Sequence, residues 1–324
     1  MTVEMLRDAT EIHNGSTQQR GGGSPLEVSF RAMGCQTHVV IHGGRPEMLV
    51  RAEAQIRLFE SLWSRFVATS DITIANGLPG RAVSVHEDTL AVVARAIAGW
   101  RQTDGLFDIT VLPGLLAHGY THSTATSQPA PPISGTRIGT NHEIALDVRA
   151  STLTVPVDSA LDLGGIGKGF AADVVAEDLM ADGAHGVLVN IGGDLVVLGQ
   201  PADGLSWHLG VEDPTKAPRH LTCLRLGSGG VATSGTTIRN WTAANGETAH
   251  HLINPMTARP SQAGLSTVTV VAGDAATAEV FATAAMMLDG DQAMAMLERN
   301  GLAGLAVGDD GCVHRTTTLR QFEA

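Results

Sequence analysis

The chain has 324 residues, a hydrophobic content of 43% and a formal net charge of −12. That hydrophobic share is enough for a sizeable core and excludes a disordered protein. The excess of acidic residues, with no dense basic run, argues against a nucleic-acid-binding protein and against a polybasic membrane patch. We therefore expect that the protein neither binds nucleic acid nor inserts into a membrane.

The cysteines and the N-terminal segment bear on the compartment. Cys35, Cys223 and Cys312 form no C-x-x-C pair, so zinc-ribbon and redox motifs are absent from the sequence. Their odd number favours a reducing compartment. The chain shows no signal peptide, no lipobox and no apolar stretch of 18 residues. We expect a cytoplasmic protein.

The first third of the chain predicts a tail followed by strands and helices. Residues 1–25 are expected to be a disordered tail, and residues 26–324 a single two-lobed domain. Apolar residues recur at helical spacing from Glu47 to Phe66. Ser84 to Glu87 resembles a capping box that opens a helix reaching about Gln102. Strands are predicted at Val28–Phe30 and Thr37–His42.

Residues 121–136, rich in Ser, Thr and Pro, are predicted to be a flexible loop. Beyond it, helices are expected at about Lys168–Asp182, Asp274–Leu288 and Asp291–Asn300, and a hairpin turn at 309–311. The strands fall in consecutive groups with helices between the groups, which predicts an α+β fold. The predicted strands are 144–148, 153–155, 161–163, 187–191, 195–198, 205–211, 220–226 and 266–272.

A glycine-rich segment carries the clearest chemical signal, and it reads Asp162-Leu-Gly-Gly-Ile-Gly-Lys-Gly-Phe-Ala-Ala-Asp173. Glycines ahead of a helix start, with one lysine, favour a phosphorylated ligand. A Walker A loop fails because Gly169 follows Lys168 where Ser or Thr is needed. A dinucleotide fingerprint fails at Phe170. A tight turn without a ligand stays an alternative.

Other polar residues have both a chemical and a structural interpretation. Glu279 and Thr283 share one face of a predicted helix, which suits a hard cation or an ordinary exposed pair. His250 and His251 would point to opposite faces of a strand, so at most one faces a site. Asp108 could bind a ligand or satisfy its own turn, and Thr233 to Gly235 could contact phosphate or form a turn.

Seven motifs occur in an order that resembles the ApbE family, whose members are FAD:protein FMN transferases. The similarity runs from about residue 28 to about residue 310. The motifs are Met33-Gly-Cys, Gly105-Leu-Phe-Asp-Ile-Thr, Asp162-Leu-Gly-Gly-Ile-Gly-Lys-Gly, Asn190-Ile-Gly-Gly-Asp, Thr233-Ser-Gly, His251-Leu-Ile-Asn-Pro-Met-Thr and Ala278-Glu-Val-Phe-Ala-Thr.

The resemblance implies an α+β fold with a T-fold-like core, mixed or antiparallel sheets with packed helices, and a flavin cleft between two lobes. It also implies a Mg²⁺-dependent enzyme with FAD as substrate. Such enzymes attach FMN through a phosphoester bond to Thr or Ser of a target flavoprotein and release AMP.

The resemblance assigns site residues position by position. Gly165 through its carbonyl, Glu279 and Thr283 would hold the metal, and His251 and Lys168 would act in catalysis, His251 as the base. In this chain Glu279 replaces the usual aspartate and Cys35 the usual threonine. FAD contacts would come from Met33, Phe66, Leu106, Phe107, Asp108, Asp162, Lys168, Ser234 and Leu252.

Two alternatives to the transferase stay open. An FAD pyrophosphatase would use the same metal site with water as the acceptor and would yield FMN and AMP. A non-catalytic FAD-binding protein would hold the nucleotide without turnover, and the glutamate at position 279 keeps that alternative open.

Overall fold

A computed structural model describes residues 3–5, 24–123, 129–201, 206–216, 218–242 and 248–324. Strand β1 (Val3–Met5) lies within the segment expected to be a tail, and it pairs antiparallel with a later strand. The structure therefore differs from that prediction at these three residues. The rest of residues 1–23, and residues 124–128 of the predicted loop, lie outside the described residues.

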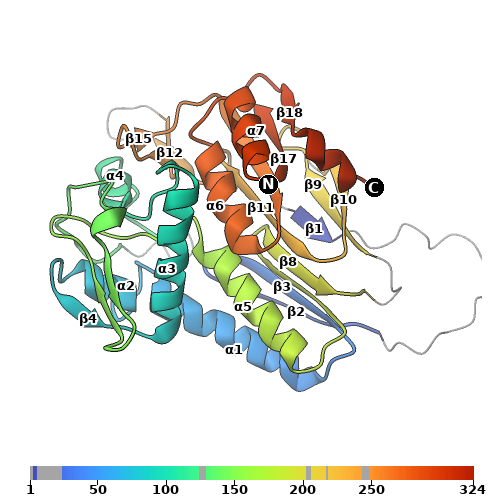
Figure 1. Cartoon of the computed structure of the whole chain (residues 1–324), viewed down its shortest axis with the longest axis horizontal. Coiled ribbons are helices and arrows are strands. Elements are labelled where there is room, and N and C mark those ends of the chain that lie inside the picture. Colours follow the sequence, from blue (N-terminus) through green and yellow to red (C-terminus); the bar gives the residue numbers. More distant parts are fainter. Residues whose placement is uncertain (1–2, 6–23, 124–128, 202–205, 217, 243–247) are drawn as a thin grey trace, which may run out of the picture.

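An eight-stranded antiparallel sheet forms the centre of the molecule (Figure 1). Its order across the sheet is β18-β17-β16-β11-β8-β7-β3-β2, so segments from both ends of the chain meet in it. The strands are β2 (Leu26–Ala32), β3 (Cys35–His42), β7 (Gly186–Ile191), β8 (Asp194–Gly199), β11 (Gly229–Gly235), β16 (Leu265–Ala272), β17 (Ala303–Gly308) and β18 (Val313–Arg315).

Each face of this sheet is covered by a different layer. In β7, Val187 and Val189 pack in the core beneath the helices, whereas Leu188 belongs to the core on the opposite face, as strand alternation requires. The second core is closed by a three-stranded sheet of β1, β9 (Trp207–Glu212) and β10 (His220–Leu226). The helices on the first face are α1 (Pro46–Trp63), α5 (Gly167–Ala181), α6 (Ala275–Ala285) and α7 (Gly290–Arg299).

Further elements lie beside the central sheet, at the left of Figure 1. They include α2 (Asp71–Asn76), α3 (Glu87–Gln102) and α4 (Leu112–Ala117). The α+β prediction is confirmed. No helix in the described ranges combines the length and apolar composition needed to cross a bilayer. The short strands are β4 (Ala82–Ser84), β5 (Ala145–Asp147), β6 (Thr152–Thr154), β12 (Asn240–Thr242), β13 (Thr248–His250), β14 (Ile253–Asn254) and β15 (Arg259–Pro260).

Three local predictions are wrong for identifiable reasons. Ser84 ends β4, and the N-cap of α3 is His86, whose ring accepts a hydrogen bond from the Asp88 amide. Residues 161–163 form no strand, because the backbone N–H and C=O of Leu161 bond the Asn76 side chain at 2.7 and 2.9 Å. Thr233 to Gly235 end strand β11 rather than forming a turn.

Helices α5 and α6 cross closely, and this contact positions the residues of both helices that line the candidate functional site. A Cβ at Gly169 would lie 2.6 Å from the carbonyl carbon of Ala275, so only glycine fits there. The Asp173 carboxylate on α5 accepts the Ala275 and Ala276 amides, each at 2.8 Å. Asp274 caps α6 by accepting the Thr277 amide, as predicted. The start of α6 is therefore fixed against α5.

Gly169→Ala should destabilise the protein by about 1–3 kcal/mol, because the added methyl overlaps backbone rather than a movable side chain. Urea unfolding monitored by circular dichroism measures the change. Gly273→Ala is the matched control, since a Cβ there meets nothing within 4 Å. Equal stability of the two variants would contradict the close crossing of α5 and α6.

Asp173 should make stability depend on pH. Burial, against the two hydrogen bonds from α6, raises the pKa of Asp173 to about 7. A carboxyl with a raised folded-state pKa contributes stability below its unfolded pKa of about 3.9 and loses it as the pH rises through 7. The stability of the wild type minus that of Asp173→Asn should therefore fall between about pH 4 and 7 in urea titrations and level off above pH 7. If the free energy of unfolding of the wild type minus that of Asp173→Asn stayed constant or rose with pH, the raised pKa would be refuted.

Candidate functional site

One cavity of about 840 Å³ gathers the predicted site residues from across the chain. Its walls come from the β2–β3 turn, the end of α1, the segment before α4, the glycine-rich loop, β11 and α6. This volume lies in the usual range for small-molecule sites. The predicted residues that line it are Met33, Phe66, Leu106, Phe107, Asp108, Asp162, Gly165, Lys168, Ser234, His251, Leu252, Glu279 and Thr283.

A buried charge cluster lies at the wall formed by α5, β8 and α6. The Lys168 ammonium forms ion pairs with the carboxylates of Asp194 and Glu279, whose side chains are both 3% exposed. The second oxygen of Glu279 accepts the Gly169 amide at 2.8 Å. The second oxygen of Asp194 accepts the Thr233 amide at 3.3 Å. The cluster therefore joins three elements and has more negative than positive groups.

The imbalance of charge sets the protonation of its members. Burial opposes the charged form of Lys168, but Asp194 and Glu279 outweigh it and raise the pKa of the lysine. Burial raises the pKa of Glu279, and the neighbouring Asp194 charge adds to this effect, against the lowering by Lys168. Lys168 is thus a charged residue whose charge is already compensated within the protein. Lys168 also lines the cavity, so its expected contact with FAD stays a prediction.

Asp194 is a site residue that the sequence did not single out, although it ends the Asn190-Ile-Gly-Gly-Asp motif. Gly192 and Gly193 both have positive φ, of 67° and 100°. That turn brings Asp194 to the start of β8, opposite Lys168. The signal available in the sequence was an aspartate directly after a glycine pair that closes a hairpin.

The expected metal ligands offer only oxygen donors. Glu279 and Thr283 lie one turn apart on α6, and Thr283 Oγ1 is 3.3 Å from Ser234 Oγ. A Cβ built on Gly165 would lie 3.2 Å from Thr283 Oγ1, so this part of the loop adjoins the helix. Each Glu279 oxygen accepts one hydrogen bond, and a carboxylate has about four acceptor positions. These donors fit the preference of magnesium.

The described residues contain no group of three or more His, Cys, Asp or Glu side chains able to hold a metal ion. A cation in this cavity would therefore depend on hydroxyl, carbonyl or ligand oxygens besides Glu279. Phosphate oxygens of a bound substrate are common partners for magnesium in such incomplete sites.

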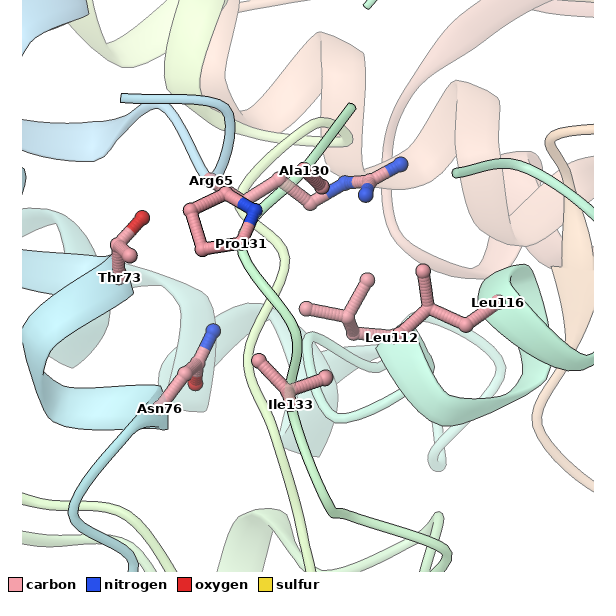
Figure 2. A pocket seen from close by; sticks show the side chains of 8 residues that line it. All are labelled: Arg65, Thr73, Asn76, Leu112, Leu116, Ala130, Pro131 and Ile133. Atoms are coloured by element: carbon pink, nitrogen blue, oxygen red, sulfur yellow. The ribbon is translucent and has the colours of Figure 1, made fainter. Parts of the chain in front are cut away.

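Asp162 is held by an arginine that the sequence did not identify. Its carboxylate pairs with Arg65 Nε at 2.8 Å and accepts the Gly164 amide at 2.7 Å. The Arg65 guanidinium lies over the Phe66 ring at 4.1 Å and over the Tyr120 ring at 4.7 Å. Arg65 also lines a second cavity of about 10 Å³, room for about one water (Figure 2).

Asp108 satisfies its own turn with one oxygen only. Its Oδ1 accepts the Thr110 amide and hydroxyl, each at 2.6 Å, which confirms the structural interpretation for that atom. Its Oδ2 is buried and makes no hydrogen bond within the described part of the chain. Burial raises the pKa of this carboxyl. Asp108 lines the cavity, but its Oδ2 is enclosed, and the Asn141 side chain is among the groups that oppose the rise of its pKa.

Only one of the two neighbouring histidines faces the cavity, as predicted, although His251 lies just beyond the end of β13. His250 Nε2 lies 2.9 Å from the Ser261 carbonyl and does not line the cavity. His251 Nδ1 lies 3.4 Å from the Arg239 carbonyl, and a carbonyl only accepts, so a hydrogen bond there leaves Nε2 unprotonated. Burial, and then the Arg239 charge, lower the pKa of His251 to about 3. Its imidazole is therefore neutral.

Removing Lys168 should cost more stability than removing either partner. Lys168→Met leaves two buried carboxylates without a counter-charge and should cost about 3–5 kcal/mol. Glu279→Gln leaves the Lys168–Asp194 pair intact and should cost less. The double variant should recover part of the Lys168→Met loss in urea unfolding. Additive losses would contradict the cluster.

Comparisons with known proteins relate this chain to one family. Residues 33–306 match the model of the ApbE family. The FAD:protein FMN transferase of Haemophilus influenzae is 30% identical over 73% of this chain and 71% of its own length. The FAD:protein FMN transferase of Escherichia coli K12 is 28% identical over 74% of this chain and 70% of its own length.

Solved structures share the fold. The ApbE protein of Thermotoga maritima superposes with a TM-score of 0.82 at 26% identity, over 93% of this chain and all of its own. The apo flavinyl transferase ApbE of Pseudomonas stutzeri gives 0.79 at 25% identity, over 94% and 98% of the two chains. With its family model and its fold in agreement, this chain belongs to the ApbE family and is a transferase like its curated relatives.

Proposed function

We propose that this transferase moves the FMN half of FAD onto a Thr or Ser hydroxyl of a target flavoprotein and releases AMP. The curated relatives carry the name FAD:protein FMN transferase. The observation that supports the proposal most is the single cavity in which an apolar wall, a carboxylate–hydroxyl pair and a neutral histidine meet. Met33, His251 and Glu279 reach this cavity from three separate parts of the chain.

The reaction exchanges one phosphorus–oxygen bond for another. The acceptor hydroxyl oxygen bonds to the phosphorus that carries riboflavin, and the bond from that phosphorus to the bridging oxygen breaks. The bridging oxygen and its electron pair leave as part of AMP. The hydroxyl proton passes to His251 Nε2 and then to solvent. Such transfers depend on alignment and charge stabilisation more than on covalent help from the protein.

The apolar residues of the cavity suit the flavin ring. Met33 lies in the β2–β3 turn, where its φ of 50° and the positive φ of Gly34 make a tight reversal. Phe107 and Leu252 are buried at 2% and 5% exposure, so their positions are fixed before a ligand enters. The Asp108 carboxyl, which lines the cavity, would accept a hydrogen bond from a ring N–H or a ribityl hydroxyl.

The polar wall suits the diphosphate. Glu279, Thr283 and the Gly165 carbonyl would hold a magnesium ion, which supplies positive charge at the phosphates. Lys168 acts by orienting Glu279 and Asp194 through its ion pairs. Ser234, whose hydroxyl lies 3.3 Å from that of Thr283, would donate to a phosphate oxygen.

His251 fits the role of a weak base. With its pKa lowered to about 3, the imidazole is neutral throughout the physiological range and can accept a proton without first losing one. A weak base suffices where the transition state is loose and the attacking hydroxyl still holds its proton.

Incubation with FAD, Mg²⁺ and a candidate acceptor flavoprotein should add one FMN mass to a single acceptor peptide. Glu279→Ala should lower the yield about 100-fold or more, because several kcal/mol of metal-derived stabilisation are lost. Chelation with EDTA should do the same. Mass spectrometry and flavin fluorescence on gels measure the product.

Glu53→Ala is the control, since Glu53 pairs with Arg57 on α1 outside the cavity. An unchanged yield from Glu279→Ala would refute the metal assignment. FMN released without any acceptor would favour an FAD pyrophosphatase instead. A yellow protein that is inert with Mg²⁺ would favour a flavin-binding protein.

A further inference from the structure

Four lysine and arginine side chains line the cavity, and they differ in whether a carboxylate of the protein pairs with their charge. Lys168 is paired with two carboxylates and Arg65 with Asp162. Arg31 lies on β2 and is exposed. Arg239 is half-buried, and its guanidinium makes no ion pair or hydrogen bond with any residue in the described ranges. Arg239 is therefore a sheltered cation whose charge is not compensated there.

Arg239 is fixed to the histidine segment of the site. Its carbonyl accepts the His251 amide at 3.3 Å and lies 3.4 Å from His251 Nδ1. It follows β11, the strand that carries Ser234, by four residues. The charge of Arg239 also helps to lower the pKa of His251, after burial. The guanidinium and the imidazole therefore belong to the same part of the cavity.

The charges of the site require a further cation. Burial raises the pKa of Glu279, but a bound divalent cation would keep it ionised, and Lys168, Asp194 and Glu279 would then carry one net negative charge. The FAD diphosphate adds one negative charge on each phosphate, and a divalent cation removes two of the three. One negative charge remains beside the buried carboxylates of Asp194 and Glu279, where an unbalanced charge is costly. Arg239 supplies the matching positive charge.

The position of Arg239 indicates which phosphate it meets. If His251 takes the acceptor proton, the hydroxyl approaches phosphorus from the His251 side. The phosphate under attack is the one bonded to riboflavin, and it then lies nearest to Arg239. A guanidinium can hold two oxygens of one phosphate in parallel, which a single ammonium cannot.

We propose that Arg239 is a catalytic residue that binds the riboflavin-linked phosphate of FAD beside His251. This inference rests on the proposed function. It assigns phosphate binding to a residue outside the glycine-rich loop, and it leaves Lys168 to orient the acidic ligands.

The test compares the binding of riboflavin, FMN and AMP to the wild type, Arg239→Gln and Arg239→Lys. Flavin fluorescence quenching and calorimetry give the dissociation constants. Arg239→Gln should weaken FMN binding about 10- to 100-fold, the range for losing a charged hydrogen bond, and leave riboflavin and AMP within about twofold. Arg239→Lys should fall between, because it keeps the charge without the planar pair of donors.

Arg259→Gln is the matched control, because this exposed arginine on β15 does not line the cavity. Equal weakening of riboflavin and FMN by Arg239→Gln would mean a structural role and overturn the proposal. So would unchanged FMN affinity, or a loss confined to AMP. If Arg239→Gln fails to fold by circular dichroism, Arg239→Lys alone decides between these outcomes.

Failure of this inference and failure of the proposed function give different results. A wild type that neither binds FAD nor modifies an acceptor refutes the function. A wild type that transfers FMN, together with an Arg239→Gln variant that binds FMN normally, refutes only the role of Arg239.

Discussion

The ion pairs of Lys168 with Asp194 and Glu279 hold the functional part of this structure together. They join the first turn of α5, the start of β8 and the middle of α6, elements that are far apart in the chain. Because all three groups are buried, removing Lys168 would leave two carboxylates without a counter-charge, whereas removing either carboxylate would leave the other paired. The same cluster fixes the orientation of Glu279, the carboxylate best placed to hold a metal ion.

The packing of α5 against α6 supports this cluster. Gly169 allows the backbones to touch, and its amide bonds Glu279 directly. One turn further along α5, Asp173 binds the two amides at the start of α6. The glycine-rich segment therefore acts as the crossing point of two helices. Its lysine completes the charge balance of the protein itself.

Much of the fold was predictable from local pattern. The helix over Ala275–Ala285, its Asp274 cap and the shared face of Glu279 and Thr283 follow from spacing alone. The strand over Gly186–Ile191 follows from an apolar run. The segment at 161–163 was not predictable, because Asn76, 85 residues away, takes the hydrogen bonds of Leu161. Tertiary partners of that kind leave no trace in the local sequence.

The site shows the same division. The residues expected from the family resemblance all line one cavity. The resemblance did not predict their ion-pair and hydrogen-bond partners. Asp194 and Glu279 lie 26 and 111 residues from Lys168, and only the fold shows that they share its ammonium. Arg65 and Arg239 were missed because an isolated arginine carries no signal until its partners, or their absence among the described residues, are known.

The most direct test of this account is a crystal structure of the protein with FAD and Mg²⁺ and without an acceptor. The account predicts the diphosphate between Arg239 on one side and Glu279, Thr283 and the Gly165 carbonyl on the other, with Lys168 still bonded to Asp194. A diphosphate bound directly by Lys168, or lying away from α6, would contradict it.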